Sequence, residues 1–156
     1  MGLTPEQQRH RRDWFRDHWT TGVAFNAHCD MTVERWDPDG VTIHLPYADR
    51  LSAHDGIFHG GVISALIDTT GSAAVLAGHD FDRGSRLTTI SLSVNYLGVA
   101  PGEDVVAEAR CTQRGGRVHF AEVVVRSESG RPVAQGLVTV NIGGQRAGAP
   151  GSNDVP

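Results

Sequence analysis

Apolar side chains recur every three or four residues between positions 61 and 77, which is the spacing of one face of an α-helix. A projection at about 100° per residue gathers mostly small and polar side chains on one side of this helix. These are Gly61, Ser64, Asp68, Gly71, Ser72 and Val75, whereas Val62, Ile63, Leu66, Ala73 and Ala74 lie on the other side. We therefore expect a largely buried helix with one stripe that a second backbone or a thin ligand can approach closely.

Alternating apolar and polar positions predict strands on both sides of this helix. Thr4 and Pro5, a capping residue and a proline at the first helical position, begin a short amphipathic helix over residues 4–19. The predicted strands cover residues 28–36, 41–47, 86–97, 104–112, 118–127 and 132–142, and a hairpin turn at 37–40 joins the first two. This order of elements predicts an α+β fold in which an antiparallel sheet surrounds one long helix.

The composition favours a single compact domain, since the chain has 156 residues of which 39% are hydrophobic. We expect an N-terminal helix at 1–22, one domain over 23–143 and a flexible C-terminal tail at 144–156. The formal net charge of -4 gives no basic surplus for a nucleic-acid partner. Cys29 and Cys111 lack the spacing of a zinc site, and no apolar run reaches the roughly 18 residues of a membrane span. These features favour a cytoplasmic protein.

Two glycines mark the place where a loop enters the long helix, in the stretch from Phe58 to Asp68. The first turn of a helix leaves backbone N–H groups without partners, and these groups with the helix dipole can hold an oxyanion. Asp68 follows in the stripe of small residues. A lone carboxylate in a buried helix is costly, which favours a functional role for Asp68. The arrangement aims amides and a carboxylate at a single place, which suits attack on a carbonyl.

The same residues resemble the hotdog-fold acyl-CoA thioesterases of the PaaI type over roughly residues 25–142. The resemblance rests on His59-Gly60-Gly61 with Asp68 nine residues after the histidine, on the strand at 89–97, and on Gly130-Arg131-Pro132-Val133-Ala134-Gln135-Gly136. It implies a hotdog fold, in which a six-stranded antiparallel sheet wraps around the long helix. It also implies a homodimer, or a dimer of dimers, with active sites at the subunit interface.

The resemblance also implies catalytic roles. Asp68 is expected to act as general base or as nucleophile, and the Gly60 N–H to polarise the thioester carbonyl. His59 is expected to position the thioester, and Thr89 to help hold the attacking water. One position departs from the pattern, because Ala53, beside His54, stands where many relatives carry Asn or Gln.

For the substrate, we expect contacts from Gly61, Phe58, Ser64 and His54, and phosphate contacts from Arg114 and Arg117 ahead of Arg83 and Arg86. Coenzyme A enters only as part of the substrate, with no separate cofactor. The spacing of His54, Asp55, His59 and Asp68 matches no strong metal motif, so no metal is expected.

Simpler interpretations remain for several residues. His59 could be a loop histidine that only bonds to backbone, and Thr89 could reflect strand propensity alone. Trp14, Phe15 and Trp19 are expected to be packing residues, with a pocket lid as the alternative. The protein as a whole could instead be a non-catalytic acyl-CoA-binding module or an enoyl-CoA hydratase. The pattern leaves the acyl group open.

Overall fold

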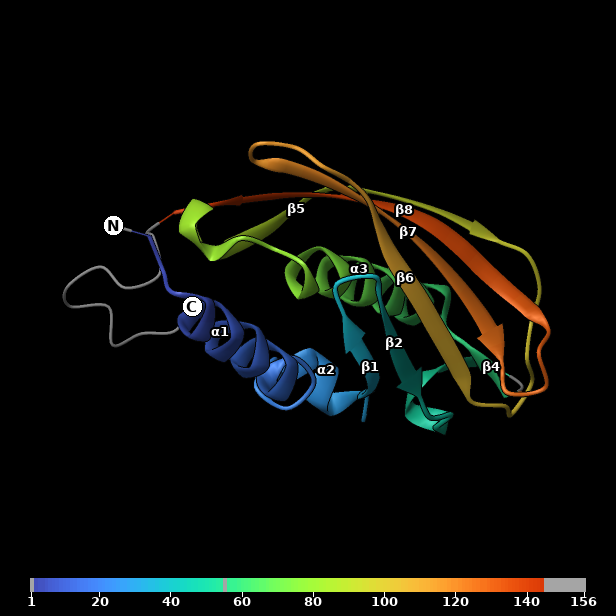
Figure 1. Ribbon diagram of the computed structural model, residues 1–156. Helices are drawn as coiled ribbons and strands as arrows, with labels where there is room; N and C mark the ends of the chain where they lie inside the picture. The colour runs from blue at the N-terminus through green and yellow to red at the C-terminus, as the bar shows by residue number, and fades with distance from the viewer. Residues whose placement is uncertain (1, 55, 145–156) are drawn as a thin grey trace.

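The computed structural model describes residues 2–54 and 56–144 and consists of one curved sheet around a central helix (Figure 1). The sheet has six antiparallel strands in the order β1-β2-β6-β7-β8-β5. The strands are β1 (Thr32–Asp37), β2 (Gly40–Leu45), β5 (Arg86–Tyr96), β6 (Val105–Arg114), β7 (Val118–Ser127) and β8 (Pro132–Gly143), and the helix is α3 (Gly60–Ala77). The fold predicted from the sequence is therefore confirmed.

The sheet wraps α3 because alternate side chains of its strands point to the helix and are buried. Burial on β7 alternates strictly, so that Ala121, Val123 and Val125 are buried and the residues between them are exposed. Gly71 lets the helix approach closely, since a Cβ at this position would lie 2.6 Å from a methyl carbon of Val138. Burial of these apolar side chains is the main stabilising contribution of the fold.

The N-terminal helix α1 (Pro5–His18) packs against α3 and begins as predicted, with Thr4 and Gln7 forming a capping box. Phe15 stacks on Phe81 with ring centroids 5.5 Å apart, and the Trp19 indole donates to the Thr69 carbonyl at 3.1 Å. These aromatic residues are therefore packing residues, as expected. In Figure 1, α1 lies beside the C-terminal end of α3.

The stripe of small residues is open only in the first half of α3, which corrects part of the sequence-based expectation. All residues from Thr70 to Ala77 are buried, including Gly71, Ser72 and Val75. The sheet accounts for Gly71, which contacts Val138, and α1 packs on the helix as well. Of the stripe that was predicted to let a second backbone or a thin ligand approach, only Gly61, Ser64 and Asp68 remain at least partly exposed.

Several short elements were not predicted. The strand expected from residue 28 begins at Thr32, because residues 24–28 form the helix α2 (Ala24–His28). The others are β3 (Ser52–His54), β4 (Ile57–Phe58) and two 3-10 turns, Asp49–Leu51 and Phe81–Arg83. Each is too short to show a hydrophobic period in the sequence.

By length and composition alone α3 could cross a membrane, but 61% of it is buried inside this protein, as for a core helix. The division into an N-terminal helix, a domain and a tail stays a prediction. Of the predicted tail, residues 145–156 lie outside the described residues.

Candidate active site

The predicted oxyanion donor, the Gly60 N–H, lies at the start of α3. His59 is the N-cap residue, and its Nδ1 accepts the Gly61 N–H at 2.9 Å. The His59 carbonyl accepts the Val62 N–H at 2.9 Å and the Ile63 N–H at 3.3 Å. Within the described part of the chain, the Gly60 N–H has no hydrogen-bond partner. The predicted oxyanion donor is thus the free group of this helix turn.

His59 has a definite tautomer in this arrangement. Because Nδ1 accepts a hydrogen bond from a backbone amide, the ring proton of neutral His59 lies on Nε2. His59 is an exposed residue, and Nε2 then remains available as a donor. His59 therefore serves as a helix cap through Nδ1, and its predicted role toward the thioester depends on Nε2.

Asp68 and Thr89 lie together, as expected of a carboxylate and a hydroxyl that act on one water. The Thr89 hydroxyl of β5 donates to Asp68 Oδ1 at 2.8 Å, and Asp68 is half-buried while Thr89 is exposed. This bond fixes the carboxylate and leaves Oδ2 without a hydrogen bond to the described residues. The second oxygen can therefore accept a proton from a bound water.

Gly60 and Asp68 do not meet within one subunit, contrary to the expectation of a single place. Asp68 is eight positions after Gly60 in one continuous helix, so their backbones lie about 12 Å apart at the usual rise of about 1.5 Å per residue. A donor and a base that act on the same carbonyl each lie within about 3.5 Å of the reacting atoms. The chain thus presents the predicted donor and the predicted base at two separate places along the same exposed stripe.

Tyr96 also reaches the start of α3, a contact that was not predicted from the sequence. Its hydroxyl donates to the Gly60 carbonyl at 2.7 Å and lies 2.5 Å from Ser64 Oγ. Strict alternation would put Thr89 and Tyr96 on opposite faces of β5, since they are seven residues apart. A bulge between Thr89 and Ser91 shifts the register and brings Tyr96 to the face of Thr89. No local sequence signal marks this bulge.

The other predicted substrate contacts are scattered. Phe58 is buried against Tyr47, with ring centroids 5.4 Å apart, and His54 lies exposed on β3. Arg114 donates to the carbonyls of Val75 at 2.7 Å and Ala74 at 3.2 Å, at the far end of α3 from Gly60. Arg117 follows in the turn after β6, where its guanidinium lies against Gly143.

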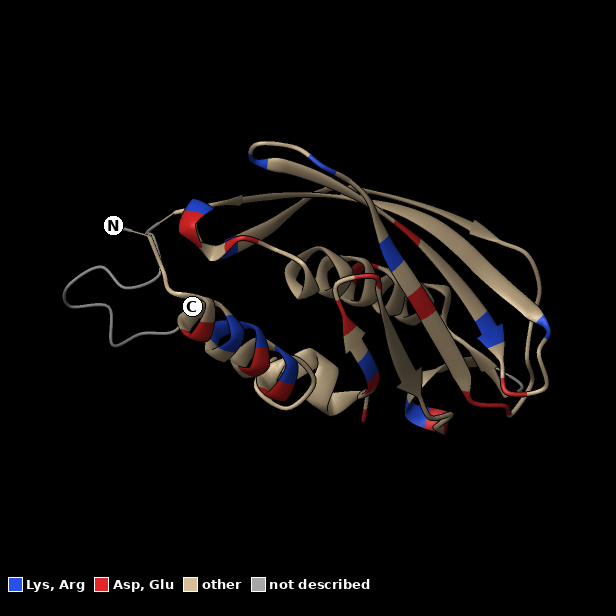
Figure 2. Ribbon diagram, in the orientation of Figure 1, with Lys and Arg blue, Asp and Glu red and all other residues tan. Residues whose placement is uncertain are grey.

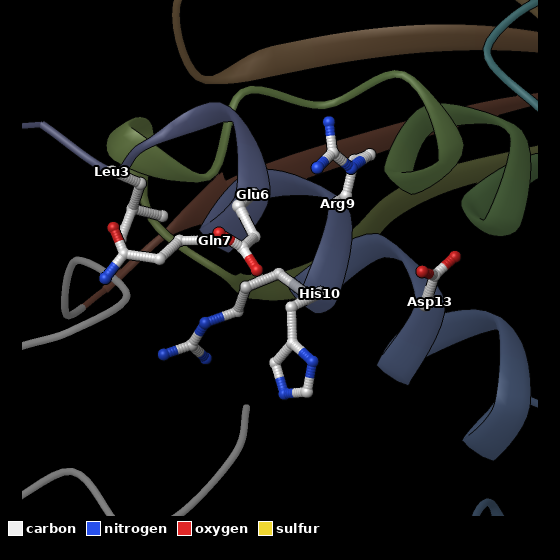
Figure 3. A pocket seen from close by; sticks show the side chains of 7 residues that line it. Leu3, Glu6, Gln7, Arg9, His10 and Asp13 are labelled. Carbon is white, nitrogen blue, oxygen red and sulfur yellow. The ribbon is translucent and has the colours of Figure 1, made fainter.

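Many charged residues and a hollow beside α1 lie outside the predicted site. Figure 2 shows charged positions along α1, whereas the sequence of α3 contains a single charged residue, Asp68. A hollow of about 600 Å³ lies along α1, where the side chains of Glu6, Arg9 and His10 project (Figure 3), but it contains none of the predicted site residues. Residues 2–54 and 56–144 hold no cluster of three or more side chains suited to a metal ion.

Comparison with known proteins decides the family. The profile of the thioesterase superfamily matches residues 55–134, which include α3, Asp68 and Thr89. The chain belongs to the thioesterase superfamily. The prediction of a thioester hydrolase is confirmed at this level.

Named relatives of this thioesterase cover most of the domain. Acyl-coenzyme A thioesterase 13 from Homo sapiens is 29% identical over 115 residues, with 72% of this chain and 80% of the relative covered. Medium/long-chain acyl-CoA thioesterase YigI from Escherichia coli is 26% identical over 134 residues, with 78% and 86% covered. A protein of Halobacterium salinarum, named as a putative esterase, is 34% identical over 98 residues, with 61% of this chain and 64% of the relative covered.

Solved structures agree on the fold. A thioesterase-superfamily protein from Shewanella oneidensis superposes with a TM-score of 0.78, at 24% identity, covering 90% of this thioesterase and 100% of that chain.

Proposed function

We propose that this thioesterase hydrolyses an acyl-CoA thioester to a free acid and coenzyme A. The observation that carries the proposal is the free Gly60 N–H at the tip of α3 together with the Asp68 carboxylate held by Thr89. The names of the human and Escherichia coli relatives support coenzyme A as the thiol part of the substrate.

The residues divide the reaction between them. The Gly60 N–H, supported by the helix dipole, binds the carbonyl oxygen as it becomes negatively charged. Asp68 Oδ2 removes a proton from water, and the resulting hydroxide attacks the carbonyl carbon; direct attack by the carboxylate is the alternative. The C–S bond then breaks, and the coenzyme A thiolate leaves and takes up a proton. No metal or additional cofactor takes part in this scheme.

A second copy of the chain completes each site in this proposal. The half-sites at Gly60 and Asp68 lie about 12 Å apart on one helix, so antiparallel pairing of two α3 helices can bring Gly60 of one subunit beside Asp68 of the other. β5 is an edge strand on which Ile90 is 56% exposed and Leu92 38% exposed. An apolar edge beside the open stripe suits burial by a second copy.

The phosphates of coenzyme A remain assigned to Arg117 and Arg114. Arg117 is the more available of the two, because the Arg114 guanidinium already donates to two carbonyls of α3. The cytoplasmic location is likewise a proposal.

Release of free thiol from a panel of acyl-CoAs tests the function directly. Wild-type protein should release thiol. Asp68→Asn should lose roughly 10²–10⁴-fold in kcat, because the amide cannot act as a base, and its free energy of unfolding should stay close to that of wild type. Asp39→Asn, which changes an exposed carboxylate in the β1–β2 turn, is the control. Near-normal turnover by Asp68→Asn would exclude the proposed role.

The same panel separates hydrolysis from binding. A non-catalytic binding module would be stabilised thermally by an acyl-CoA and release no thiol. The ranking of short, medium, branched and aromatic acyl groups would then identify the preferred substrate.

A further inference from the structure

We infer that Tyr96 is a positioning residue that, with Ser64, holds the tip of α3 so that the Gly60 N–H is aimed at the substrate carbonyl. The inference rests on the proposed function. The Tyr96 side chain reaches α3 from β5, and its hydroxyl bonds to the backbone next to the Gly60 amide.

The three groups form a directed chain of hydrogen bonds. The Tyr96 hydroxyl has one proton and donates it to the Gly60 carbonyl at 2.7 Å. Ser64 Oγ, 2.5 Å from the Tyr96 oxygen, must therefore be the donor in the second bond. Each bond in such a chain polarises and strengthens the next one.

The bond to the Gly60 carbonyl is not needed to satisfy that carbonyl. Gly60 is the first residue of α3, and its carbonyl is the acceptor for the Ser64 amide in the helix ladder. Burial does not explain the tyrosine either, because Tyr96 is 55% exposed. What the hydroxyl adds is a second, directional contact at the helix tip.

This contact clamps the peptide between Gly60 and Gly61 from both sides. Tyr96 holds its carbonyl oxygen, and His59 Nδ1 holds its N–H at 2.9 Å. Two consecutive glycines have unusual backbone freedom. Rotation about the backbone bonds of Gly60 would turn the Gly60 N–H, which lies in the preceding peptide, away from its target. Fixing the donor before the substrate binds is the condition under which an oxyanion site is effective.

The ring of Tyr96 also limits the room at Gly60. A Cβ there would lie 3.3 Å from the Tyr96 hydroxyl oxygen and 3.4 Å from the ring carbon that carries it. Glycine at this position and tyrosine on β5 therefore fit together, and a phenylalanine would keep the ring contact while losing the bond.

The test compares kcat and KM for thiol release by wild type, Tyr96→Phe and Ser64→Ala, with thermal unfolding of each. The inference predicts a fall of about tenfold in kcat for Tyr96→Phe, with KM and stability nearly unchanged, below the ~10²–10³-fold expected for loss of the donor itself. The kcat of Ser64→Ala should fall less than that of Tyr96→Phe. Tyr47→Phe, which removes a hydroxyl that bonds to Asp49 instead, should leave kcat unchanged.

A double variant shows whether Tyr96 acts through Gly60. In a Gly60→Pro background the amide is gone, so Tyr96→Phe should cause no further loss in kcat. Full additivity of the two losses would overturn the inference and leave the proposed function standing. The same holds if wild type is active and the single variant Tyr96→Phe has an unchanged kcat. Absence of thiol release by the wild type would overturn the proposed function and the inference together.

Discussion

At the scale of the residue, Gly60 supplies the donor in the proposed reaction. Its N–H has no hydrogen-bond partner among the described residues, and a proline would remove this donor at a helical position that suits proline, while adding a ring. The preceding residue, His59, already has a ψ of 132°, which is the extended conformation preferred before proline. Gly60→Pro should therefore lower kcat by ~10²–10³-fold without unfolding α3.

Gly60→Ala is the matched control for this prediction. It adds a Cβ in the same place, 3.3 Å from the Tyr96 hydroxyl, but keeps the N–H. Thiol release should fall much less in the alanine variant. Equal losses in the two variants would show that crowding, and not the amide, limits the reaction.

Individual site residues were predictable where the signal is local. Gly60, His59 and Asp68 stand within one short stretch, and the free amide follows from helix geometry alone. Tyr96 was not predictable, because it reaches Gly60 across 36 residues and only after a bulge has turned it over. Contacts of this kind depend on strand register, which the sequence does not display.

At the scale of the element, α3 is held at its C-terminal end by Arg114. The guanidinium donates to the Val75 and Ala74 carbonyls, which lie in the last turn, where a positive charge also suits the helix dipole. Arg114→Gln should lower the free energy of unfolding by about 1–3 kcal/mol, since buried carbonyls lose charged donors. Urea unfolding of the variant measures this loss.

Arg117→Gln is the control at the same β6–β7 turn and should unfold close to wild type. Similar losses in both variants would contradict the capping role. The same two proteins also test phosphate binding, because loss of a phosphate contact raises KM for acyl-CoA but not for an acyl-pantetheine that lacks the nucleotide.

The long elements followed from periodicity, and the short ones did not. Eighteen residues of α3 and ten of β7 show a clear hydrophobic pattern. α2 has five residues and β4 two, and their conformations depend on contacts such as that between Asn26 and Thr69, 3.1 Å apart. Tertiary contacts determine such segments, so no local pattern predicts them.

For the whole molecule, two buried histidines make stability depend on pH. Burial is the main cause that lowers the pKa of His79 to about 4, and burial also lowers the pKa of His119, whose ring lies 5.5 Å away. Both residues are about 2% exposed, and Arg114 acts on both pKa values in the same direction. Asp80 acts on His79 in the opposite direction, as does the hydrogen bond to Gly84.

The sign follows from proton binding. The unfolded chain, with an ordinary histidine pKa of about 6.5, binds the His79 proton more strongly than the folded one. Stability is therefore fully present above pH 6.5 and is lost as the pH falls toward 4. His79 alone should lower the free energy of unfolding by roughly 2 kcal/mol between pH 6.5 and 5.

Urea unfolding at pH 7 and pH 5 checks this expectation. His79→Gln should weaken the pH dependence, because an amide does not titrate yet can still donate to the Gly84 carbonyl, which His79 Nε2 contacts at 2.9 Å. His10→Gln changes an exposed histidine and should keep the wild-type dependence. If the free energy of unfolding of His79→Gln changes between pH 7 and pH 5 as it does in wild type, His79 is not the source of the pH dependence.

Subunit mixing tests the central claim, which is that Gly60 of one subunit and Asp68 of another form each active site. Gly60→Pro and Asp68→Asn homodimers should both be inactive, whereas a purified mixed dimer has one lesion-free site and should recover about half of the wild-type thiol release. If the mixed dimer stays as inactive as its parents, Gly60 and Asp68 do not combine across subunits, and the account of the site is wrong.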